Sequence, residues 1–290
     1  MPSTTIQDLP LGPDVTVLES NADGLIALNK PDGVLSHPNA KDSSKDQSRA
    51  LLTASYDDAA ECYQWTDDAG QSHAAWLINR LDSPTSGVIL MALDPDLAEV
   101  LKQQFSTHRV TKVYYAVVRC DRKPGGGEWK DVLSKEVYTA SRIKKRQSIP
   151  AKTRYQWARN PTGNLSICLL KLTPVTGRTH QLRVQCAKHG YPIVGDRTYG
   201  DFAYNKEIAS ETGLKRLMLH SAETTVRYAF KGQTRELTAS AELPESFKSL
   251  LRHRKKKQIA PQKRVLAQQP KRPKPFKTSS VLKGRRFRRK

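Results

Sequence analysis

Residues 75–92 read AWLINRLDSPTSGVILMA, and this stretch says more about the fold than any other part of the 290-residue chain. An apolar run enters it, a polar loop with Pro84 and Gly87 interrupts it, and a second apolar run, VILMA, leaves it. The pattern predicts strand, loop, strand, with the loop at a sheet edge. The loop places Asp82 two residues after Arg80, a spacing that taken alone is more typical of a surface ion pair.

The segments on either side predict a mixed α+β domain with many strands and few helices. Val15–Lys30 indicates two short strands joined by a turn at Asn21–Gly24. Asp94 as N-cap, with proline next, predicts a helix that runs to Phe105. Further strands are expected at 113–118, across 132–173 and at 217–228, and short helices at 50–60, 181–189 and 245–251.

A second polar cluster, GRTHQLR at 177–183, follows a predicted turn. If a helix begins at Gln181, the residues before it lie at a helix N-terminus, which favours anions. The planar guanidinium of Arg183 is suited to binding a carboxylate. A solvated basic turn is the simpler alternative on these residues alone.

The formal net charge of +21 is concentrated at the C-terminal end. Residues 251–290 contain 17 Lys or Arg and no Asp or Glu, which leaves 32 basic and 28 acidic residues in the first 250. A tail of this charge attracts polyanions: RNA, DNA or an anionic membrane surface. Its four prolines, and its lack of a sustained apolar face, argue against membrane binding.

The four cysteines, Cys62, Cys120, Cys168 and Cys186, are far apart and include no Cys-x-x-Cys pair. Neither a zinc site nor a disulfide framework is therefore expected. We interpret them as reduced, partly buried thiols of a cytoplasmic protein. The N-terminal residues do not resemble a secretory signal, and no apolar run of 18 residues predicts a transmembrane helix.

Five segments of the chain resemble, in order, the motifs of the RluA-type RNA pseudouridine synthases. They are IALNKPDGVLSHP at 26–38, RLDSPTSG at 80–87, KVYYAVV at 112–118, GRTHQLRV at 177–184 continuing into GYPIVGDRTYG at 190–200, and LMLHS at 217–221. The resemblance implies a long, mixed, mostly antiparallel sheet with flanking helices and a central catalytic cleft.

The resemblance also implies a reaction and its catalytic residues. A uridine in RNA loses its bond from nitrogen 1 to ribose, the base turns, and carbon 5 rejoins the sugar. No redox change occurs and no group leaves, so neither a metal nor an organic cofactor is expected. Asp82 matches the catalytic carboxylate, which attacks the sugar or removes a sugar proton, and Arg183 matches its basic partner. Tyr114 matches a tyrosine that stacks on the base and assists proton transfer at carbon 5.

RNA contacts follow from the same resemblance, because a stacked base must flip out before it can react. Arg80 is the candidate to fill the vacated space or to contact phosphate, and Leu182 to pack beneath the flipped base. Arg178 and His180 are expected either to contact phosphate and the loop or to make structural hydrogen bonds. Asp196 is interpreted as a residue that holds its loop.

One residue departs from the family pattern: Asn79 stands where a histidine usually precedes Arg-Leu-Asp. Asparagine donates and accepts hydrogen bonds but carries no charge. It suffices if the histidine only positions the loop; otherwise the enzyme is slower or differently selective. The small RNA-binding domain of many longer relatives is not expected here. We predict a flexible arm at 1–14, a catalytic domain at 15–251 and a disordered basic tail at 252–290.

Three other functions stay open at this point. The departure at Asn79 and the long tail favour an inactive RNA- or ribosome-associated factor. A glycoside hydrolase would need a second carboxylate beside Asp82, and the motifs supply none. The tail alone would also permit DNA binding. For the enzyme, ribosomal RNA is the preferred partner because a long basic tail suits a dense RNA particle, and transfer RNA is the alternative. We expect a monomer that does not bind membranes.

Overall fold

The computed structural model describes residues 9–38, 48–121, 125–138, 144–159 and 161–254, with side chains omitted from 135 to 147. Its strands are β1 (Thr16–Ser20), β2 (Leu25–Lys30), β3 (Ser55–Asp57), β4 (Cys62–Thr66), β5 (Ser72–Leu77), β6 (Ser86–Ala92), β7 (Thr111–Arg119), β8 (Gly127–Tyr138), β9 (Lys144–Arg159), β10 (Ile167–Pro174), β11 (Leu219–Phe230) and β12 (Gln233–Ser240). Its helices are α2 (Pro95–Ser106), α3 (Gln181–Lys188), α4 (Phe202–Thr212) and α5 (Glu245–Arg252).

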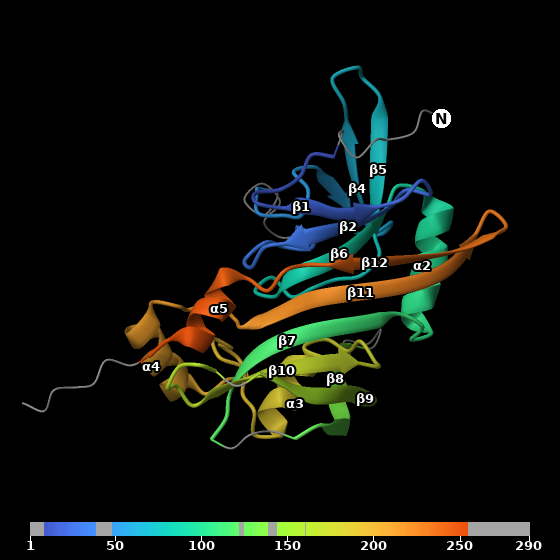
Figure 1. Cartoon of the computed structure of the whole chain (residues 1–290). Helices are drawn as coiled ribbons and strands as arrows, with labels where there is room; N and C mark the ends of the chain where they lie inside the picture. The colour runs from blue at the N-terminus through green and yellow to red at the C-terminus, as the bar shows by residue number, and fades with distance from the viewer. Residues whose placement is uncertain (1–8, 39–47, 122–124, 139–143, 160, 255–290) are drawn as a thin grey trace, which may run out of the picture. The chain divides into compact units, whose positions relative to one another are not determined.

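The strands form one mixed sheet in the order β3-β4-β5-β6-β11-β7-β10-β9-β8 (Figure 1). β2 also pairs with β6 and carries β1, and β12 pairs with β11. Among the described strand pairs, β6 with β11 is parallel and the others are antiparallel. The predicted α+β class and the mostly antiparallel sheet are therefore confirmed.

Strand β6 explains the continuous apolar run at the end of residues 75–92. All seven of its residues are buried, because apolar clusters cover both faces of the strand. Val88 and Leu90 face the cluster under α2, whereas Ile89 and Met91 face the cluster of the N-terminal strands. A strand covered on both faces reads as a continuous apolar run.

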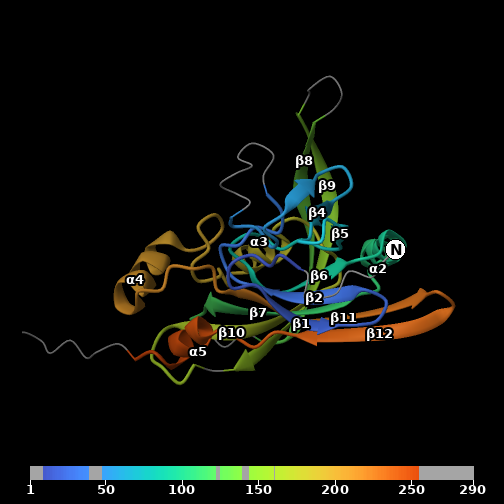
Figure 2. The same cartoon turned by 90° about the horizontal axis from the view of Figure 1, so that it is seen from above.

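Helix α2 begins as predicted at Asp94, whose carboxylate accepts hydrogen bonds from the Asp96 and Leu97 backbone N–H groups at 2.9 and 3.1 Å. Helices α3 and α5 also lie where they were expected. Figures 1 and 2 show α2 at one end of the sheet and α4 and α5 together at the other.

Several local predictions are wrong. Residues 50–60 contain turns and β3 instead of a helix. Tyr56 of β3 pairs with Tyr63 of β4, and this strand pairing overrides a weak helix signal. Strands β4 and β12 and helix α4 were not expected. Leu9, assigned to a flexible arm, is buried, and Leu11 forms a bridge with Leu52, so residues 9–14 belong to the folded body.

The cysteine prediction also fails for one pair. Cys120 and Cys168 form a disulfide with their Cα atoms 6.0 Å apart. The pairing of β7 with β10 brings these two positions together although 48 residues separate them in sequence. Cys62 and Cys186 are free and buried, as expected.

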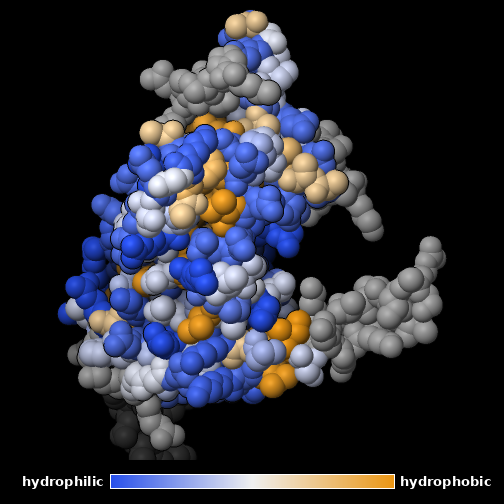
Figure 3. All heavy atoms as spheres, turned by 90° about the vertical axis from the view of Figure 1, so that its right-hand side faces the viewer, coloured by the Kyte–Doolittle hydropathy of each residue, from blue (hydrophilic) through white to orange (hydrophobic). Residues whose placement is uncertain are grey.

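The described residues belong to a compact unit that ends at Lys255. The remaining unit, Lys256–Lys290, lies outside the described residues, and with it most of the predicted tail. Figure 3 shows a mainly hydrophilic face with small, separate apolar spots. Within the described part of the chain, the large apolar side chains that are exposed are Val132 and Phe202, and no helix could cross a membrane.

Candidate active site

One cleft of about 940 Å³ collects the residues predicted to act. Its walls are the loop between β5 and β6, the first half of β7, the segment from β10 into α3, and the end of α2. The lining includes all seven predicted site residues: Asp82, Tyr114, Arg183, Arg80, Leu182, Arg178 and His180.

Two buried polar side chains, Lys30 and Ser36, fix the loop that carries Asp82 by hydrogen bonds to its backbone. The Lys30 ammonium, fully buried at the end of β2, donates to three backbone carbonyls at 2.7–3.0 Å, one of them that of Ser83. The Ser36 hydroxyl donates to the Leu81 carbonyl at 2.8 Å and accepts from the Leu81 N–H at 3.1 Å. The residues on both sides of Asp82 are thereby held in place.

Gly87 is required where the loop enters β6. Its φ is +109°, and a Cβ there would lie 2.0 Å from the Ser221 carbonyl oxygen of β11. Only glycine permits this conformation together with such a close approach. The parallel contact of β6 with β11 therefore depends on the glycine that ends the loop.

Arg183 is the closest basic partner of Asp82. It lies in the first turn of α3, and its Nη1 donates to Asp82 Oδ2 at 3.0 Å. Its Nε and Nη2 donate to the two carboxylate oxygens of Asp196 at 2.8 and 2.9 Å. Burial opposes the charge of Arg183, but Asp196 and Asp82 outweigh it and raise the arginine pKa above its ordinary range. Asp196 thus orients Arg183, a task beyond the loop-holding role predicted for it.

The exposed fractions of these three side chains differ in a useful way. Asp196 is 1% exposed and Arg183 is 7% exposed, whereas Asp82 is 26% exposed. A doubly hydrogen-bonded arginine is rigid, so its remaining N–H groups can hold a carboxylate in one orientation. The Asp82 carboxylate is consequently oriented from inside the protein and accessible from the cleft.

His180 supplies a second group near Asp82. Its backbone is left-handed, with φ 54°, which is uncommon for a residue other than glycine. Its Nδ1 lies 3.1 Å from the Tyr199 hydroxyl and its Nε2 3.7 Å from Asp82 Oδ1. Tyr199 also packs against the Arg183 guanidinium, 5.2 Å from the ring centroid. The strained turn into α3 therefore aims the imidazole at the carboxylate.

Tyr114 lines the cleft from β7, opposite Leu172 on one side and Ser221 on the other. Burial raises the pKa of its phenol, the charge of Asp82 adds to the increase and the Ser221 hydroxyl opposes it. The phenol is therefore neutral and able to donate a proton. Tyr115 does not line the cleft, because successive side chains of a strand point to opposite faces.

The remaining predicted residues occupy the rim and the base of the cleft. Arg80 is exposed, and the Arg178 Nε donates to the Pro150 carbonyl at 3.3 Å. Leu182 is buried in the apolar core beneath α3. At Asn79, Oδ1 accepts the Leu90 backbone N–H at 2.9 Å, which ties the loop to β6.

Sequence reasoning missed a polar network next to the loop, in which Ser86 and His220 are buried. Arg216 donates to Asp32 at 2.6 Å and to the Ser86 hydroxyl at 2.6 Å, and that hydroxyl lies 2.9 Å from His220 Nδ1. It joins residues that are up to 188 positions apart in sequence, Asp32 and His220, so no local pattern could show it. Lys112 was also missed as a site residue, although it stands two positions before Tyr114 on the same face of β7.

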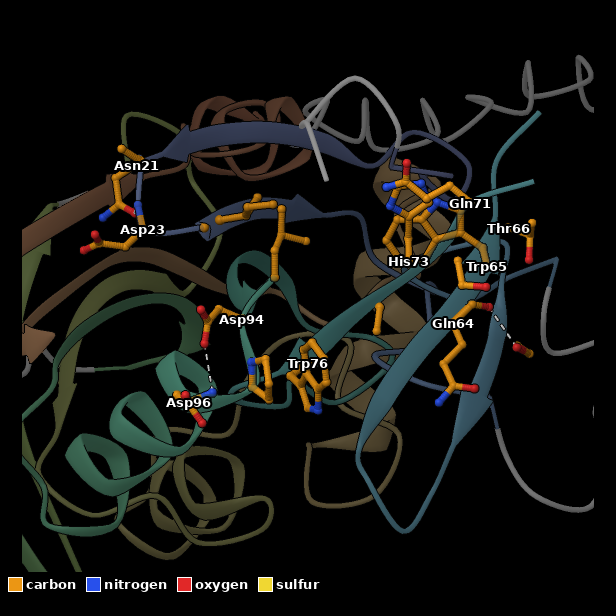
Figure 4. A pocket seen from close by; sticks show the side chains of 18 of the residues that line it. Asn21, Asp23, Gln64, Trp65, Thr66, Gln71, His73, Trp76, Asp94 and Asp96 are labelled. Carbon is orange, nitrogen blue, oxygen red and sulfur yellow. Dashed lines mark hydrogen bonds between the residues drawn. The ribbon is translucent and has the colours of Figure 1, made fainter. Parts of the chain in front are cut away.

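The charges of the lining residues distinguish this cleft from a second, larger hollow of about 1550 Å³. Arg80, Arg178, Arg183 and Lys112 line the cleft against a single carboxylate, Asp82. The second hollow, beside the β4–β5 hairpin, is lined by Trp65, Trp76 and His73, with Asp23, Asp94 and Asp96 against Lys231 (Figure 4). The lining charges therefore favour a polyanion in the cleft over the second hollow, where Asp94 pairs with Lys231 and Asp23 with Arg235.

Comparisons with known proteins agree with the motifs. A family model described as RNA pseudouridylate synthase matches residues 24–188. The tRNA pseudouridine synthase C of Yersinia pestis is 32% identical over 232 residues, which cover 76% of this chain and 84% of that protein. The tRNA pseudouridine synthase C of Haemophilus ducreyi is 32% identical over 237 residues, covering 79% and 91%.

Two solved human structures share the fold. RNA Pseudouridylate Synthase Domain Containing 4 superposes with a TM-score of 0.55 at 24% identity, covering 81% of this chain and 91% of that one. RNA Pseudouridylate Synthase Domain Containing 1 superposes with a TM-score of 0.53 at 20% identity, covering 84% and 97%. At these identities the likeness extends to the fold alone.

Proposed function

The chain belongs to the RluA-type RNA pseudouridine synthase family and isomerises uridine in RNA, and on that premise we propose that Asp82 is its catalytic carboxylate. One observation carries the proposal: Asp82 is hydrogen-bonded to Arg183 at 3.0 Å yet remains accessible from a cleft whose other charged residues are cationic. An ionised, oriented carboxylate is what attack on a sugar or removal of a sugar proton requires.

Tyr114 and Arg183 complete the proposed machinery. After the bond from nitrogen 1 breaks and the base turns, carbon 5 bonds to the ribose and loses a proton, and nitrogen 1 gains one, so atoms and charge balance. The neutral Tyr114 phenol, in a wall of the same cleft, stacks on the base and relays the proton: it gives its own proton to nitrogen 1 and takes the proton that leaves carbon 5, so it ends neutral. Arg183 keeps Asp82 oriented through both chemical steps.

Four further residues are proposed to hold the RNA. Arg80, exposed at the rim, fills the space left by the flipped base or contacts its phosphate. Leu182 packs beneath the base, and Arg178 and His180 contact the backbone near the loop. We further propose that the body through residue 251 is the catalytic domain and that the basic tail at 252–290 adds affinity without sequence preference.

Transfer RNA is the proposed substrate, because relatives that match most of this chain carry that substrate in their names. Ribosomal RNA is the second candidate, and the 17 basic residues of the tail favour it since they suit a dense RNA particle. The protein is proposed to act as a monomer.

The substrate is tested by incubating the purified protein with transfer and ribosomal RNA from a host that lacks the gene. Carbodiimide labelling and primer extension then map every new pseudouridine. We expect one or a few sites in transfer RNA. Sites in ribosomal RNA alone would establish the second candidate. A chain ending at residue 254 should bind RNA more weakly and with a smaller salt dependence, and unchanged binding would contradict the role of the tail.

A further inference from the structure

Lys112 places a cation in the cleft on a wall that holds no carboxylate. It lies two residues before Tyr114 in β7, so strand alternation puts both side chains on the same face. Its Nζ lies 3.5 Å from where a Cβ on Gly177 would be, and 5.7 Å from the centre of the Phe105 ring. The ammonium therefore sits between the end of α2 and the start of the GRTHQLR segment.

The other buried or half-buried cations around the site are paired, and the half-buried Lys112 is not. Arg183 binds two carboxylates, Arg216 binds Asp32, and Lys30 binds three carbonyls. Within the described residues, the Lys112 ammonium has neither an ion pair nor a hydrogen bond to an anion or carbonyl, and it lies over the Phe105 ring. Burial lowers its pKa, and no neighbouring anion offsets this. Partial burial of an unpaired charge is unfavourable, so an anion entering the cleft would relieve it.

The position favours an anion that accompanies the reacting base over a role in the reaction itself. Asp82 is contacted by Arg183 and His180, and Lys112 is not among its ion-pair partners. Gly177 has no side chain, so the space beside the Lys112 ammonium stays open. The anion that an RNA strand brings next to a flipped base is its own phosphate.

Resting on the proposed function, we propose that Lys112 binds a phosphate of the RNA strand adjacent to the flipped uridine, in the open space beside Gly177. Lys112 is thus a binding residue that places the nucleotide against Tyr114 and Asp82. Arg178, which follows Gly177, borders the same space.

The first test measures RNA binding in the inactive Asp82→Ala protein, so that no product forms. Lys112→Gln should raise the dissociation constant about tenfold near 0.1 M salt, as expected for a lost hydrogen bond to a charged group. It should also reduce the slope of log Kd against log salt by about 0.7–0.9. Lys112→Arg should keep the slope. The matched control is Lys171→Gln, because Lys171 pairs with Tyr115 on the other face of the sheet, and it should change neither quantity.

The second test identifies the phosphate. A stem-loop substrate carries a neutral methylphosphonate at one position at a time around the target uridine. One position should weaken binding about tenfold with Lys112 present and have no further effect with Lys112→Gln. Additive losses at every position, or an unchanged salt slope, would overturn the proposal. So would a fall in kcat for Lys112→Gln at saturating RNA with KM unchanged, because that split indicates a role in the chemical step.

Failure of the inference is distinguishable from failure of the proposed function. If the protein with Asp82 intact forms pseudouridine but Lys112→Gln binds RNA normally, the phosphate site alone is wrong. If replacing Asp82 leaves pseudouridine formation intact, the proposed catalytic role is wrong whatever Lys112 does. Thermal unfolding of each variant shows that the comparison is made between folded proteins.

Discussion

Replacing Asp196 with asparagine removes the charge that orients Arg183 and keeps the size of the side chain. Both Asp196 oxygens accept from the arginine, at 2.8 and 2.9 Å, and the carboxylate is 1% exposed. An asparagine NH₂ would meet a guanidinium N–H, donor against donor, so one hydrogen bond is lost outright. Breaking a buried ion pair costs about 3–5 kcal/mol. Because Asp82 remains as a second partner, we expect a loss of about 3 kcal/mol in the free energy of unfolding.

The same substitution should reduce turnover more than RNA binding. Arg183 would be held less firmly, by Asp82 and Thr198 alone, and a small displacement of a catalytic group costs about 100-fold in rate. Urea unfolding followed by circular dichroism measures the stability, and single-turnover pseudouridine formation measures the rate. The exposed Glu242–Lys248 pair, 3.7 Å apart, provides the control, since Glu242→Gln should leave both values unchanged. An Asp196→Asn protein with wild-type stability and turnover would refute the orienting role.

Three further changes test the support of the loop. Lys30→Met leaves three carbonyls without their donor. It should lower the free energy of unfolding in urea by about 3 kcal/mol and also reduce turnover, and unchanged values of both would show that Lys30 does not fix the loop. Asn79→His retains an acceptor for the Leu90 N–H and should keep turnover within about threefold, whereas Asn79→Leu should lose more than about tenfold; equal rates would mean that the hydrogen bond is unimportant. Burial lowers the pKa of His220 to about 4, so the unfolded chain binds this proton more tightly and acidification from about pH 6.5 to 4 destabilises the fold. That loss should be on the order of 3 kcal/mol and absent in His220→Asn, and identical pH profiles for the two proteins would contradict it.

Local patterns were sufficient where structure is set by neighbours in sequence. The strand, loop and strand around Asp82, and helix α2 with its Asp94 cap, follow from apolar periodicity and capping chemistry. The helix predicted for residues 50–60 is wrong because their conformation is decided by pairing with β4. The Cys120–Cys168 disulfide was missed for a similar reason, since it depends on the register of β7 with β10.

The site itself could be assembled from sequence only through the family resemblance. Spacing gave no reason to join Asp82 to Arg183, which follows it by 101 residues. The resemblance supplied that pair, but not the Asp196 carboxylate that orients Arg183 or the Lys30 ammonium that fixes the loop. These contacts form where the sheet brings distant segments together. Their strength depends on burial, and burial cannot be read from the sequence alone.

The most direct test of the central claim is a single-turnover assay of pseudouridine formation in transfer RNA with wild-type protein and with Asp82→Asn. The substitution keeps the size of the side chain and one oxygen that can accept from Arg183, but removes the charge needed to attack the sugar or take its proton. We predict that Asp82→Asn binds the RNA with near-wild-type affinity and forms no detectable pseudouridine. Wild-type rates from Asp82→Asn would show that another group performs the chemistry.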